Sequence, residues 1–299
     1  MKKFFIVGGT GFIGSNLLSV LSKENYQVYV LVRSEEKAKK LPSFCKAILG
    51  DPTQKGEWQK KLNEADITIN FAGQNIFGRW NKEYKKLILE SRIKSTENVI
   101  NSLKEGALLV NASAIGYYGN KGNTLVTEDS LPGDDFLAKV CIEWEKKALE
   151  AKERGGRVII TRFGIVLGNG GMLSKILPLF KWGLGGTLGR GNQWFSWIHI
   201  EDLVSAILFL IENEKEGVYN LTSPKPVTNK EFTKTLGKIL KRPTLLPVPI
   251  FAIKLLFGDL AKAITSSVKV YPKRLLELGF SFKFDNIESA LRNLIEKTI

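Results

Sequence analysis

The sequence predicts an α/β fold, namely a doubly wound parallel sheet with a smaller C-terminal lobe. Three observations predict it: a short apolar run enters a glycine-rich turn at the start, apolar runs alternate with helical stretches through the first half, and a late strand-like run occupies residues 217–221. A chain of 299 residues with 43% hydrophobic composition can form one large α/β domain, alone or with a smaller satellite.

The opening stretch carries the strongest signal. Phe4–Val7 is predicted to be a buried strand, and a turn with Gly-x-x-Gly-x-x-Gly spacing follows it. Gly8 suits the tight turn, Gly11 lets a pyrophosphate approach the backbone, and Gly14 lets the next helix pack against the strand. The N–H groups at the start of that helix are expected to hold the phosphates. The cofactor-binding residues predicted here are Gly8, Thr10, Gly11, Phe12, Ile13 and Gly14.

The second predicted strand, Gln27–Val32, indicates which dinucleotide is bound. It follows an amphipathic stretch over residues 15–22, so the unit has the length of a βαβ crossover. Arg33 and Ser34 stand at the tip of the strand, where a site for NAD usually has an acidic residue that holds the ribose 2′-hydroxyl. Because Arg favours a 2′-phosphate, the predicted cofactor is NADP.

Two further strand-like runs, Lys46–Leu49 and Asp66–Phe71, end in small or polar residues. Ligands of parallel sheets lie beyond the carboxyl ends of the strands, so Asp51 is expected at the adenine amino group. The predicted wall along the dinucleotide consists of Phe71, Ala72 and Gly73. The alternative is that these are simple turn residues.

A helical stretch over residues 81–104 and a fifth strand at residues 107–111 lead to Ser-Ala-Ile-Gly-Tyr-Tyr-Gly at residues 113–119. Together with the Gly-Gly-Thr-Gly-Phe-Ile-Gly turn, Asn-Phe-Ala-Gly, Arg-Phe-Gly and Trp-Ile-His-Ile-Glu-Asp, this segment resembles the extended short-chain dehydrogenase/reductases over the whole chain. Residues 136–145 and 185–189 are more closely similar to its epimerase-like subgroup of the NAD-dependent epimerase/dehydratase family. Members of that subgroup are commonly described as nucleoside-diphosphate-sugar epimerases, with their substrate unassigned.

The resemblance implies a division of the chain. An NAD(P)-binding Rossmann domain is expected over residues 1–167 and 197–221, and the substrate lobe over residues 168–196 and 222–299, including a C-terminal segment typical of the subgroup. The resemblance also adds Arg162 to the expected cofactor-binding residues.

The catalytic Tyr-x-x-x-Lys pair of the parent family is missing from this chain. On the predicted helix at residues 135–154, one alignment places Leu137 and Cys141 at those positions, and the neighbouring alignment places Phe136 and Val140 there. The remaining candidates for proton transfer are Ser113, Tyr117, Tyr118 and His199. The alternatives are that both tyrosines pack the loop and that the histidine is structural.

The substrate-binding residues are expected near the glycine-rich loop and after the Ala-Gly turn. Phe195 falls where the family has an Arg that grips a nucleotide diphosphate, and an aromatic ring cannot replace a guanidinium fork. The predicted substrate residues are Arg79, Trp80, Arg190, Gln193 and Trp194. The alternatives are a solvated helix face for the first pair and core packing for the aromatic residues.

The charge, the apolar stretches and the cysteine content limit the kinds of partner that we expect. The net charge of +14 is spread over helices with interleaved acidic residues and lacks a nucleic-acid-binding signature, so no nucleic-acid partner is expected. The apolar stretch Leu245–Phe257 is too short to span a bilayer, so no membrane partner is expected either. Two cysteines outside any metal-ligand pattern and a single histidine predict no metal site and a cytoplasmic location. Monomer and homodimer remain open.

Two functions follow. The first is an atypical NADP(H)-dependent oxidoreductase or epimerase that transfers hydride to or from a small carbonyl or hydroxyl substrate. The second is an NADP(H)-binding regulatory or sensor protein with altered catalysis, and some relatives are linked to division of the cell or plastid. The missing Tyr-x-x-x-Lys pair is the feature that separates the two.

Overall fold

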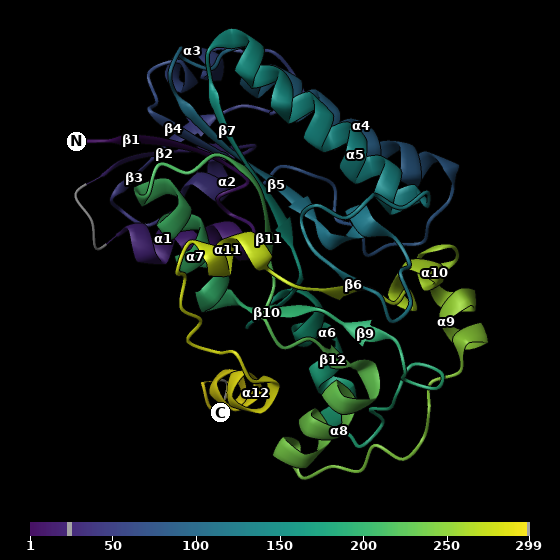
Figure 1. The fold of residues 1–299 in the computed structure, drawn as a ribbon. Helices are drawn as coiled ribbons and strands as arrows, with labels where there is room; N and C mark the ends of the chain where they lie inside the picture. The colour runs from purple at the N-terminus through teal and green to yellow at the C-terminus, as the bar shows by residue number, and fades with distance from the viewer. Residues whose placement is uncertain (23–25, 298–299) are drawn as a thin grey trace.

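The computed structural model describes residues 1–22 and 26–297 and is built around a seven-stranded sheet (Figure 1). The strand order is β11-β7-β5-β4-β1-β2-β3, and every neighbouring pair is parallel. The strands are β1 (Lys3–Val7), β2 (Gln27–Val32), β3 (Cys45–Leu49), β4 (Ile67–Asn70), β5 (Leu108–Ala114), β7 (Arg157–Phe163) and β11 (Gly217–Leu221). The order reverses between β1 and β4, so the doubly wound fold is confirmed and its switch point lies at the glycine turn.

Helices cover both faces of this sheet (Figure 1). On one face α1 (Phe12–Leu21) packs beside α7 (Ile200–Glu212), and on the other α4 (Lys82–Ile100) packs beside α5 (Phe136–Leu149). Shorter elements are α2 (Glu35–Ala38), α3 (Trp58–Leu62) and the 3-10 turns η1 (Ile115–Tyr118) and η2 (Glu150–Arg154). Continuous apolar strands such as Phe4–Val7 fit a sheet that is buried on both faces.

The remaining elements form the C-terminal lobe below the sheet in Figure 1. Three small strand pairs lie outside the main sheet: β8 (Ile165–Leu167) with β10 (Trp197–His199), β9 (Trp194–Phe195) with β12 (Val227–Thr228), and β6 (Leu125–Val126) with β13 (Lys269–Val270). The last pair joins the lobe to a loop of the main body. The helices of the lobe are α6 (Gly171–Lys181), α8 (Asn229–Leu240), α9 (Ile250–Phe257), α10 (Leu260–Ile264), α11 (Lys273–Glu277) and α12 (Ile287–Glu296). Within the described residues, none of these helices is long and apolar enough to cross a membrane.

The lobe shares its core with the sheet. One cluster of buried side chains runs from Phe4 and Ile6 of β1 through Leu203 of α7 to Leu291 and Leu294 of α12. A continuous core of this kind couples folding of the lobe to folding of the sheet. The division at residues 167, 197 and 221 therefore stays a prediction, although the late strand β11 does return to the main sheet as expected.

Several boundaries differ from expectation for local reasons. Helix α1 begins at Phe12, because Gly11 is its N-cap, rather than at Ser15. The fifth strand extends to Ala114, so Ser113 lies within β5 rather than after it. The predicted helix over residues 135–154 is an α-helix only to Leu149, and a 3-10 turn then ends at Gly155, whose φ is +74°.

Candidate active site

The glycine turn after β1 has the backbone shape that a pyrophosphate site needs. Gly8 has a φ of +84°, a conformation that favours glycine. A Cβ atom added to Gly14 would lie only 2.6 Å from Cα of Gly9, so only glycine lets α1 pack this closely. The N-cap residue Gly11 offers no side-chain hydrogen bond, which leaves the first N–H groups of α1 for a ligand. These features fit a dinucleotide without adjustment of the backbone.

A loop of the C-terminal lobe lies against this turn. Cβ atoms added to Gly168, Gly170 or Gly171 would all crowd the ring of Phe12. Thr10, Phe12 and Ile13 are half-buried, whereas Gly11 is exposed. The loop therefore meets the helix start through Phe12 and brings the lobe to the edge of the predicted cofactor site.

The tip of β2 carries the residues expected to select the cofactor. Arg33 and Asp51 approach each other, with 4.0 Å between Nε and Oδ1, and both side chains are about half exposed. Burial raises the pKa of Asp51, but hydrogen bonds from Thr53 and the charge of Arg33 outweigh it and leave that pKa below its ordinary value. Ser34 accepts a hydrogen bond from the Lys37 N–H and caps α2. Arg33 is thus a half-exposed cation held loosely at the strand tip, and its contact with a ribose 2′-phosphate stays a prediction.

A buried polar network fixes the end of β4. The Asn70 amide donates to Asn111 Oδ1 at 2.8 Å and to Thr96 Oγ1 at 3.0 Å, and its own oxygen accepts the Ala72 N–H. Phe71 is half-buried with its ring edge toward Phe163 at 6.0 Å between centroids. These hydrogen bonds fix the backbone where it leaves β4, at Ala72 and Gly73.

The serine at the end of β5 is bonded to a glutamate of α5. Ser113 Oγ donates to Glu145 Oε1 at 2.6 Å, and Glu145 also accepts two hydrogen bonds of 2.8 Å from Arg162. The side chains of Glu145 and Arg162 are only 7% and 4% exposed. Burial lowers the pKa of Arg162, but the paired carboxylate of Glu145 outweighs it and holds that pKa above its ordinary value.

These contacts give Arg162 a structural partner on every side. Its Nη1 donates to the Tyr118 hydroxyl at 2.9 Å and to the Glu128 carbonyl oxygen at 3.4 Å. The role of Arg162 in cofactor binding therefore stays a prediction. Glu145 is not among the predicted site residues, although an acidic residue between Cys141 and Ala148 on the buried face of α5 indicates a paired charge.

The two adjacent tyrosines occupy different environments. Tyr118 is fully buried and donates to Asn220 Oδ1 at 2.7 Å, and burial raises its pKa to about 12. Tyr117 is half-buried, and the guanidinium carbon of Arg162 lies 3.4 Å from the centre of its ring. Among the described residues none hydrogen-bonds the Tyr117 hydroxyl. Of the two phenols, Tyr117 is the one left open to a substrate.

The contacts of α5 decide between the two alignments of the missing pair. A Cβ atom added to Gly116 of η1 would lie 3.3 Å from Leu137 Cβ and 3.8 Å from Cys141 Sγ. Leu137 and Cys141 therefore face the η1 turn that follows β5, which favours the first alignment. Burial raises the pKa of the Cys141 thiol to about 12, so this side chain stays a neutral thiol, and a thiol has no cationic form that could replace the Lys.

A cation from another helix lies beside Cys141. Arg92 of α4 sits over the Trp144 ring at 5.0 Å, and a Cβ atom added to Gly73 would touch its guanidinium carbon. Its Nη1 donates to the carbonyl oxygens of Gln74 and Ile88, and no salt bridge pairs it within the described residues. Burial lowers its pKa, as expected for a cation that lacks an acidic partner. Arg92 is not among the residues predicted for the site.

His199 lies apart from the strand ends described above. It is fully buried on β10, its Nδ1 accepts the Glu201 N–H at 3.1 Å, and its ring stacks on Phe284 at 3.9 Å. Burial lowers its pKa to about 4, so the ring is neutral. This geometry fits the structural alternative, and a catalytic role for His199 stays a prediction.

The predicted substrate residues fall into two groups. Trp80 is buried and packs edge-on against Phe136, whereas Arg79 beside it is exposed. In the lobe, the Gln193 amide donates to the Leu188 carbonyl oxygen, and the Trp194 indole donates to Asn123 beneath Lys269. Arg190 is exposed. Arg79 and Arg190 are thus the two charged residues of the set, and both side chains are exposed to solvent. The neighbouring Phe195 and Trp197 belong to the hydrophobic core.

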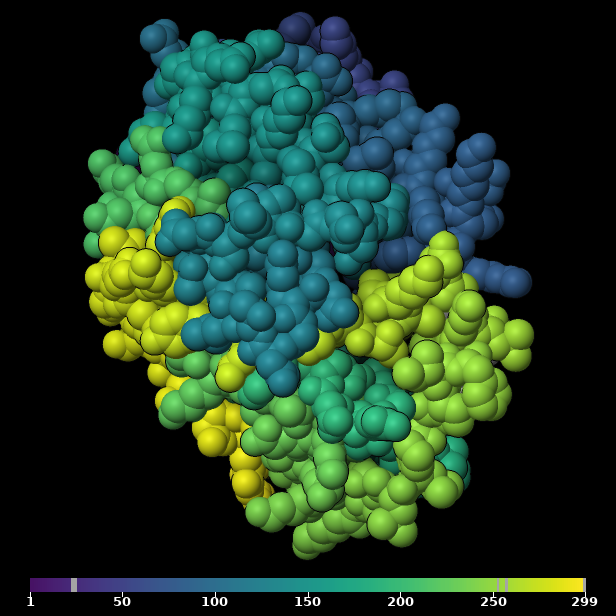
Figure 2. Space-filling view, turned by 45° about the vertical axis from the view of Figure 1, so that its right-hand side comes forward, coloured from purple at the N-terminus to yellow at the C-terminus, as the bar shows by residue number. Residues whose placement is uncertain are grey.

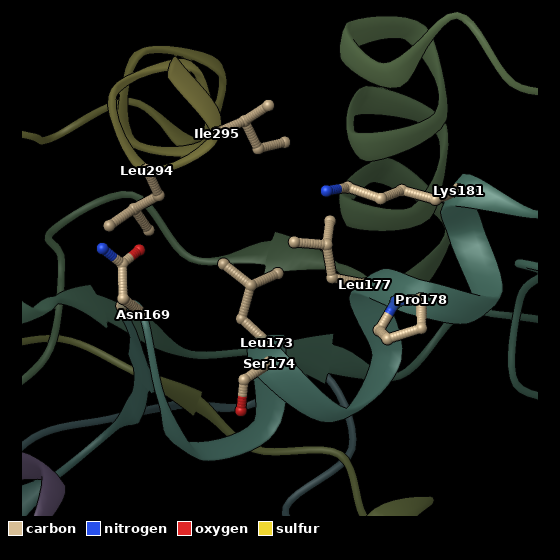
Figure 3. Close-up of a pocket in the computed structure, with 9 residues that line it drawn as sticks. Asn169, Leu173, Ser174, Leu177, Pro178, Lys181, Leu294 and Ile295 are labelled. Carbon is tan, nitrogen blue, oxygen red and sulfur yellow. The ribbon is translucent and has the colours of Figure 1, made fainter. Parts of the chain in front are cut away.

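A hollow of about 200 Å³ lies between α6 and α12 (Figure 3). In Figure 3, Leu173 and Leu177 of α6 face Leu294 and Ile295 of α12, with Lys181 at one side. Its other lining residues are Gly168, Asn169, Ser174 and Pro178. None of the predicted site residues lines the hollow, although its lining residue Gly168 also lies against Phe12 of the glycine turn.

Comparison with known proteins supports the same picture. The model of the NAD dependent epimerase/dehydratase family matches residues 4–222, and a domain of unknown function matches residues 248–294. The chain is 40% identical to a chloroplastic epimerase family protein of Arabidopsis thaliana, the SDR39U1 homolog, over 97% of this chain and 86% of that protein. It is 37% identical to the epimerase family protein YfhF of Bacillus subtilis over 97% of each.

Solved structures agree with the fold. The human epimerase family protein SDR39U1, crystallised with NADPH, is 29% identical and superposes with a TM-score of 0.84 over 98% of this chain and 99% of that chain. A UDP-glucuronic acid 4-epimerase from Bacillus cereus, at 17% identity and a TM-score of 0.81 over 99% and 100% of the two chains, shows the fold alone. On the family match and the relatives at 37% to 40% identity, the chain belongs to the NAD-dependent epimerase/dehydratase family.

Proposed function

We propose that this chain binds NADP(H) along the carboxyl ends of β1, β2 and β4. The observation that carries the proposal is the glycine cradle at Gly8–Gly14 together with the half-exposed Arg33 at the tip of β2. The cradle leaves N–H groups of α1 for a pyrophosphate, and Arg33 provides the charge for a 2′-phosphate. The NADPH found in the human relative supports this choice of cofactor.

We further propose that the chain is an atypical oxidoreductase or epimerase for a small carbonyl or hydroxyl substrate. When bound, NADP(H) supplies the hydride donor or acceptor for such a substrate. Thr10, Ala72 and Gly73 line the path of the dinucleotide, and Asp51 lies where it reaches the adenine amino group. Arg79 and Arg190 are exposed cations beside the buried Trp80 and the held Trp194, so they suit a polar or anionic part of the substrate.

Tyr117 is the residue we propose for proton transfer. Its side chain is half-buried, the Arg162 guanidinium packs against its ring, and none of the described residues hydrogen-bonds its hydroxyl, which is therefore available to a substrate. Tyr118 suits this task less, because burial raises its pKa to about 12 and its oxygen is bonded on both sides. Ser113 can assist only if its hydroxyl leaves Glu145.

Arg92 is the residue we propose for the task of the missing Lys. It lies between Gly73, at the end of β4, and Cys141, at the position of that Lys. A cation here can hold the nicotinamide ribose and stabilise developing negative charge from α4 rather than from α5. The chain would thus retain the charge of the site while changing the helix that supplies it.

Cofactor titrations test the binding proposal. Quenching of tryptophan fluorescence by NADPH and by NADH gives the two dissociation constants for the full chain. We expect NADPH to bind about tenfold more tightly, since a charged hydrogen bond to the 2′-phosphate is lost with NADH. Equal affinities, or tighter binding of NADH, would contradict the proposal.

Turnover tests the chemistry separately. Loss of reduced-nicotinamide absorbance is followed with a panel of aldehydes, ketones and keto sugars. For any substrate found, Tyr117→Phe should lower kcat by about 100-fold, because a positioned proton donor contributes that much. Tyr118→Phe is the matched control, and its kcat should change far less. An effect confined to Tyr118→Phe would show that the wrong phenol is assigned.

One observation favours a second function, a regulatory or sensor protein that binds NADP(H). Leu137 and the neutral Cys141 face the η1 turn that follows β5, at the positions of the catalytic pair in the first alignment. Under this proposal no substrate of the panel turns over, and a partner protein binds differently to the NADP⁺ and NADPH forms. Pull-down in the presence of each cofactor form tests this, and a partner indifferent to the cofactor would contradict it.

A further inference from the structure

About half of the large apolar side chains that the structure leaves exposed lie in two segments of the C-terminal lobe. Leu179, Trp182 and Leu184 lie at the end of α6 and just after it. Leu245, Leu246, Phe251 and Leu255 lie before and on α9. Trp182, Leu245, Leu246, Phe251 and Leu255 are between 76% and 86% exposed, which is unusual for side chains of this size within one segment pair.

The two segments form one surface. The Val248 N–H donates to the Thr187 carbonyl oxygen at 2.7 Å, and the Gly189 N–H donates to the Val248 carbonyl oxygen at 3.0 Å. Gly183 lies against Pro243, and the Gly186 backbone contacts the Leu246 carbonyl. We call this surface, made of residues 179–184 and 245–255, the apolar ridge.

The charge around the apolar ridge is mostly positive. The sequence contains no Asp or Glu between Glu153 and Glu201, or between Glu231 and Asp259. The exposed cations beside the exposed apolar residues are Lys181, Lys241, Arg242 and Lys254, and none of them forms a salt bridge within the described residues. Asp259 interacts with Lys254 but is paired with Lys85, so an excess of cations remains. Such a surface is complementary to an anionic, partly apolar partner.

The apolar ridge projects from the molecule instead of lining a groove. In Figure 2 the yellow-green chain around residue 250 stands out from the body at the lower right. A helical or extended peptide needs a concave surface for its side chains, whereas a bilayer interface accepts projecting Trp, Phe and Leu side chains. A second copy of the chain would bring these four cations against the same four cations, which opposes a symmetric dimer through this surface.

We propose that the apolar ridge docks the protein on the surface of an anionic lipid bilayer, with Trp182, Phe251 and Leu255 entering the headgroup region. The flanking cations then contact anionic headgroups. Docking of this kind requires no membrane-spanning helix, which is consistent with the short helices of the described residues. It differs from the prediction, made from the sequence, that the protein has no membrane partner. It is independent of whether the chain turns over a substrate.

Vesicle sedimentation with the full chain tests the proposal. The vesicles are phosphatidylcholine alone, or phosphatidylcholine in which roughly a quarter of the lipid is phosphatidylserine. We expect binding to the anionic vesicles to be at least about tenfold stronger and to weaken as salt is added. Failure of the folded protein to bind either vesicle, or equal binding to both, would overturn the proposal.

Matched variants separate the apolar ridge from the rest of the basic surface. The double variant Trp182→Ser/Phe251→Ser should lower the partition coefficient by at least about tenfold, because both side chains lose their burial in the interface. Leu131→Ser is the control, since Leu131 is 80% exposed but lies outside the apolar ridge. Lys254→Glu should weaken binding by about tenfold, and Lys39→Glu, just after α2, should weaken it less.

Two results would overturn the assignment of the surface. One is unchanged vesicle binding by the double variant, with thermal unfolding showing that it remains folded. The other is sedimentation velocity in which the wild-type chain is a dimer and the double variant a monomer, since the apolar ridge would then bind a second copy.

Discussion

The two halves of the predicted cleft differ in what their polar groups are free to do. At the ends of β1 and β2, the first N–H groups of α1 lack a side-chain cap and Arg33 is half exposed. At the end of β5, Ser113, Glu145, Arg162 and Tyr118 hydrogen-bond one another and are buried. One half is open to a ligand, and the other is satisfied by the protein itself.

In this fold, therefore, the polar groups open to a cofactor are separate from the polar groups expected near catalysis, which bond one another. A buried network with every donor used stabilises one arrangement and offers little to a substrate. An open helix start and a loosely held cation cost stability unless a ligand arrives. Four sets of substitutions test this difference between the two halves.

The first change removes the charge at the centre of the closed half. Glu145→Gln leaves Arg162 buried without its counter-ion, which should lower the free energy of unfolding by about 3–5 kcal/mol. Urea denaturation measures this change. Glu143→Gln, on the exposed face of the same helix, should change it by less than about 0.5 kcal/mol. A shift for Glu145→Gln as small as that of its control would show that the network is not closed.

The second change concerns pH and the buried His199. Because burial lowers its pKa from 6.5 to about 4, the unfolded chain binds more protons between these pH values. His199 therefore contributes nothing unfavourable above pH 6.5, and stability falls by up to about 3 kcal/mol as the pH drops to about 4.

His199→Asn keeps a helix-capping side chain but does not titrate, so it should remove this slope. Thermal unfolding across the pH range measures it. Burial raises the pKa of Glu201, but its bonds to Lys283 and Lys297 outweigh burial and lower this pKa from 4.5 to about 2. The stability that Glu201 contributes is therefore present above pH 4.5 and is lost as the pH falls from 4.5 to about 2. An unchanged slope in the variant would show that another group titrates in this range.

The third change disrupts the glycine turn of the open half, where the cofactor is expected to bind. Gly14→Ala places a methyl group against the backbone of Gly9, which should displace α1 and weaken NADPH binding by about 100-fold. Gly122→Ala is the control for backbone strain, because its φ is +57° and its added Cβ would meet nothing within 4 Å. Isothermal titration of both variants gives the comparison. Equal affinities would place the cofactor elsewhere.

The fourth change tests the tip of β2. Arg33→Ser should reduce the preference for NADPH over NADH by about tenfold, since it removes one charged contact with the 2′-phosphate. Lys39→Ser, another exposed cation just beyond α2, should leave the preference unchanged. Equal loss in both variants would indicate a general effect of surface charge rather than a contact.

The sequence allowed prediction of the open half because its signals are local. Glycine spacing, strand length and the residue at a strand tip all act within about 30 residues of the chain, the length of one βαβ unit. Strand β7 was overlooked although the run Val158–Thr161 is fully buried and apolar for most of its length. That strand was detectable from its pattern.

The closed half depends on contacts between distant segments, which no local pattern records. The partnership of Glu145 with Ser113 joins residues 32 positions apart, and Tyr118 with Asn220 joins residues 102 apart. Which helix residues stand in place of the catalytic pair stays a prediction, and packing against Gly116 favours Leu137 over Phe136. Arg92 approaches Cys141 from a separate helix, so its position follows from the fold alone.

A crystal structure of the full chain grown with NADPH would test directly whether the open half binds the cofactor while the closed network stays intact. We expect the 2′-phosphate on Arg33, the pyrophosphate at the start of α1, and the nicotinamide ring against Leu137 with Arg92 near its ribose. We also expect that Ser113, Glu145 and Arg162 keep their hydrogen bonds to one another. A nicotinamide ring away from Leu137, or a network that opens to contact the cofactor, would contradict the separation of the two halves.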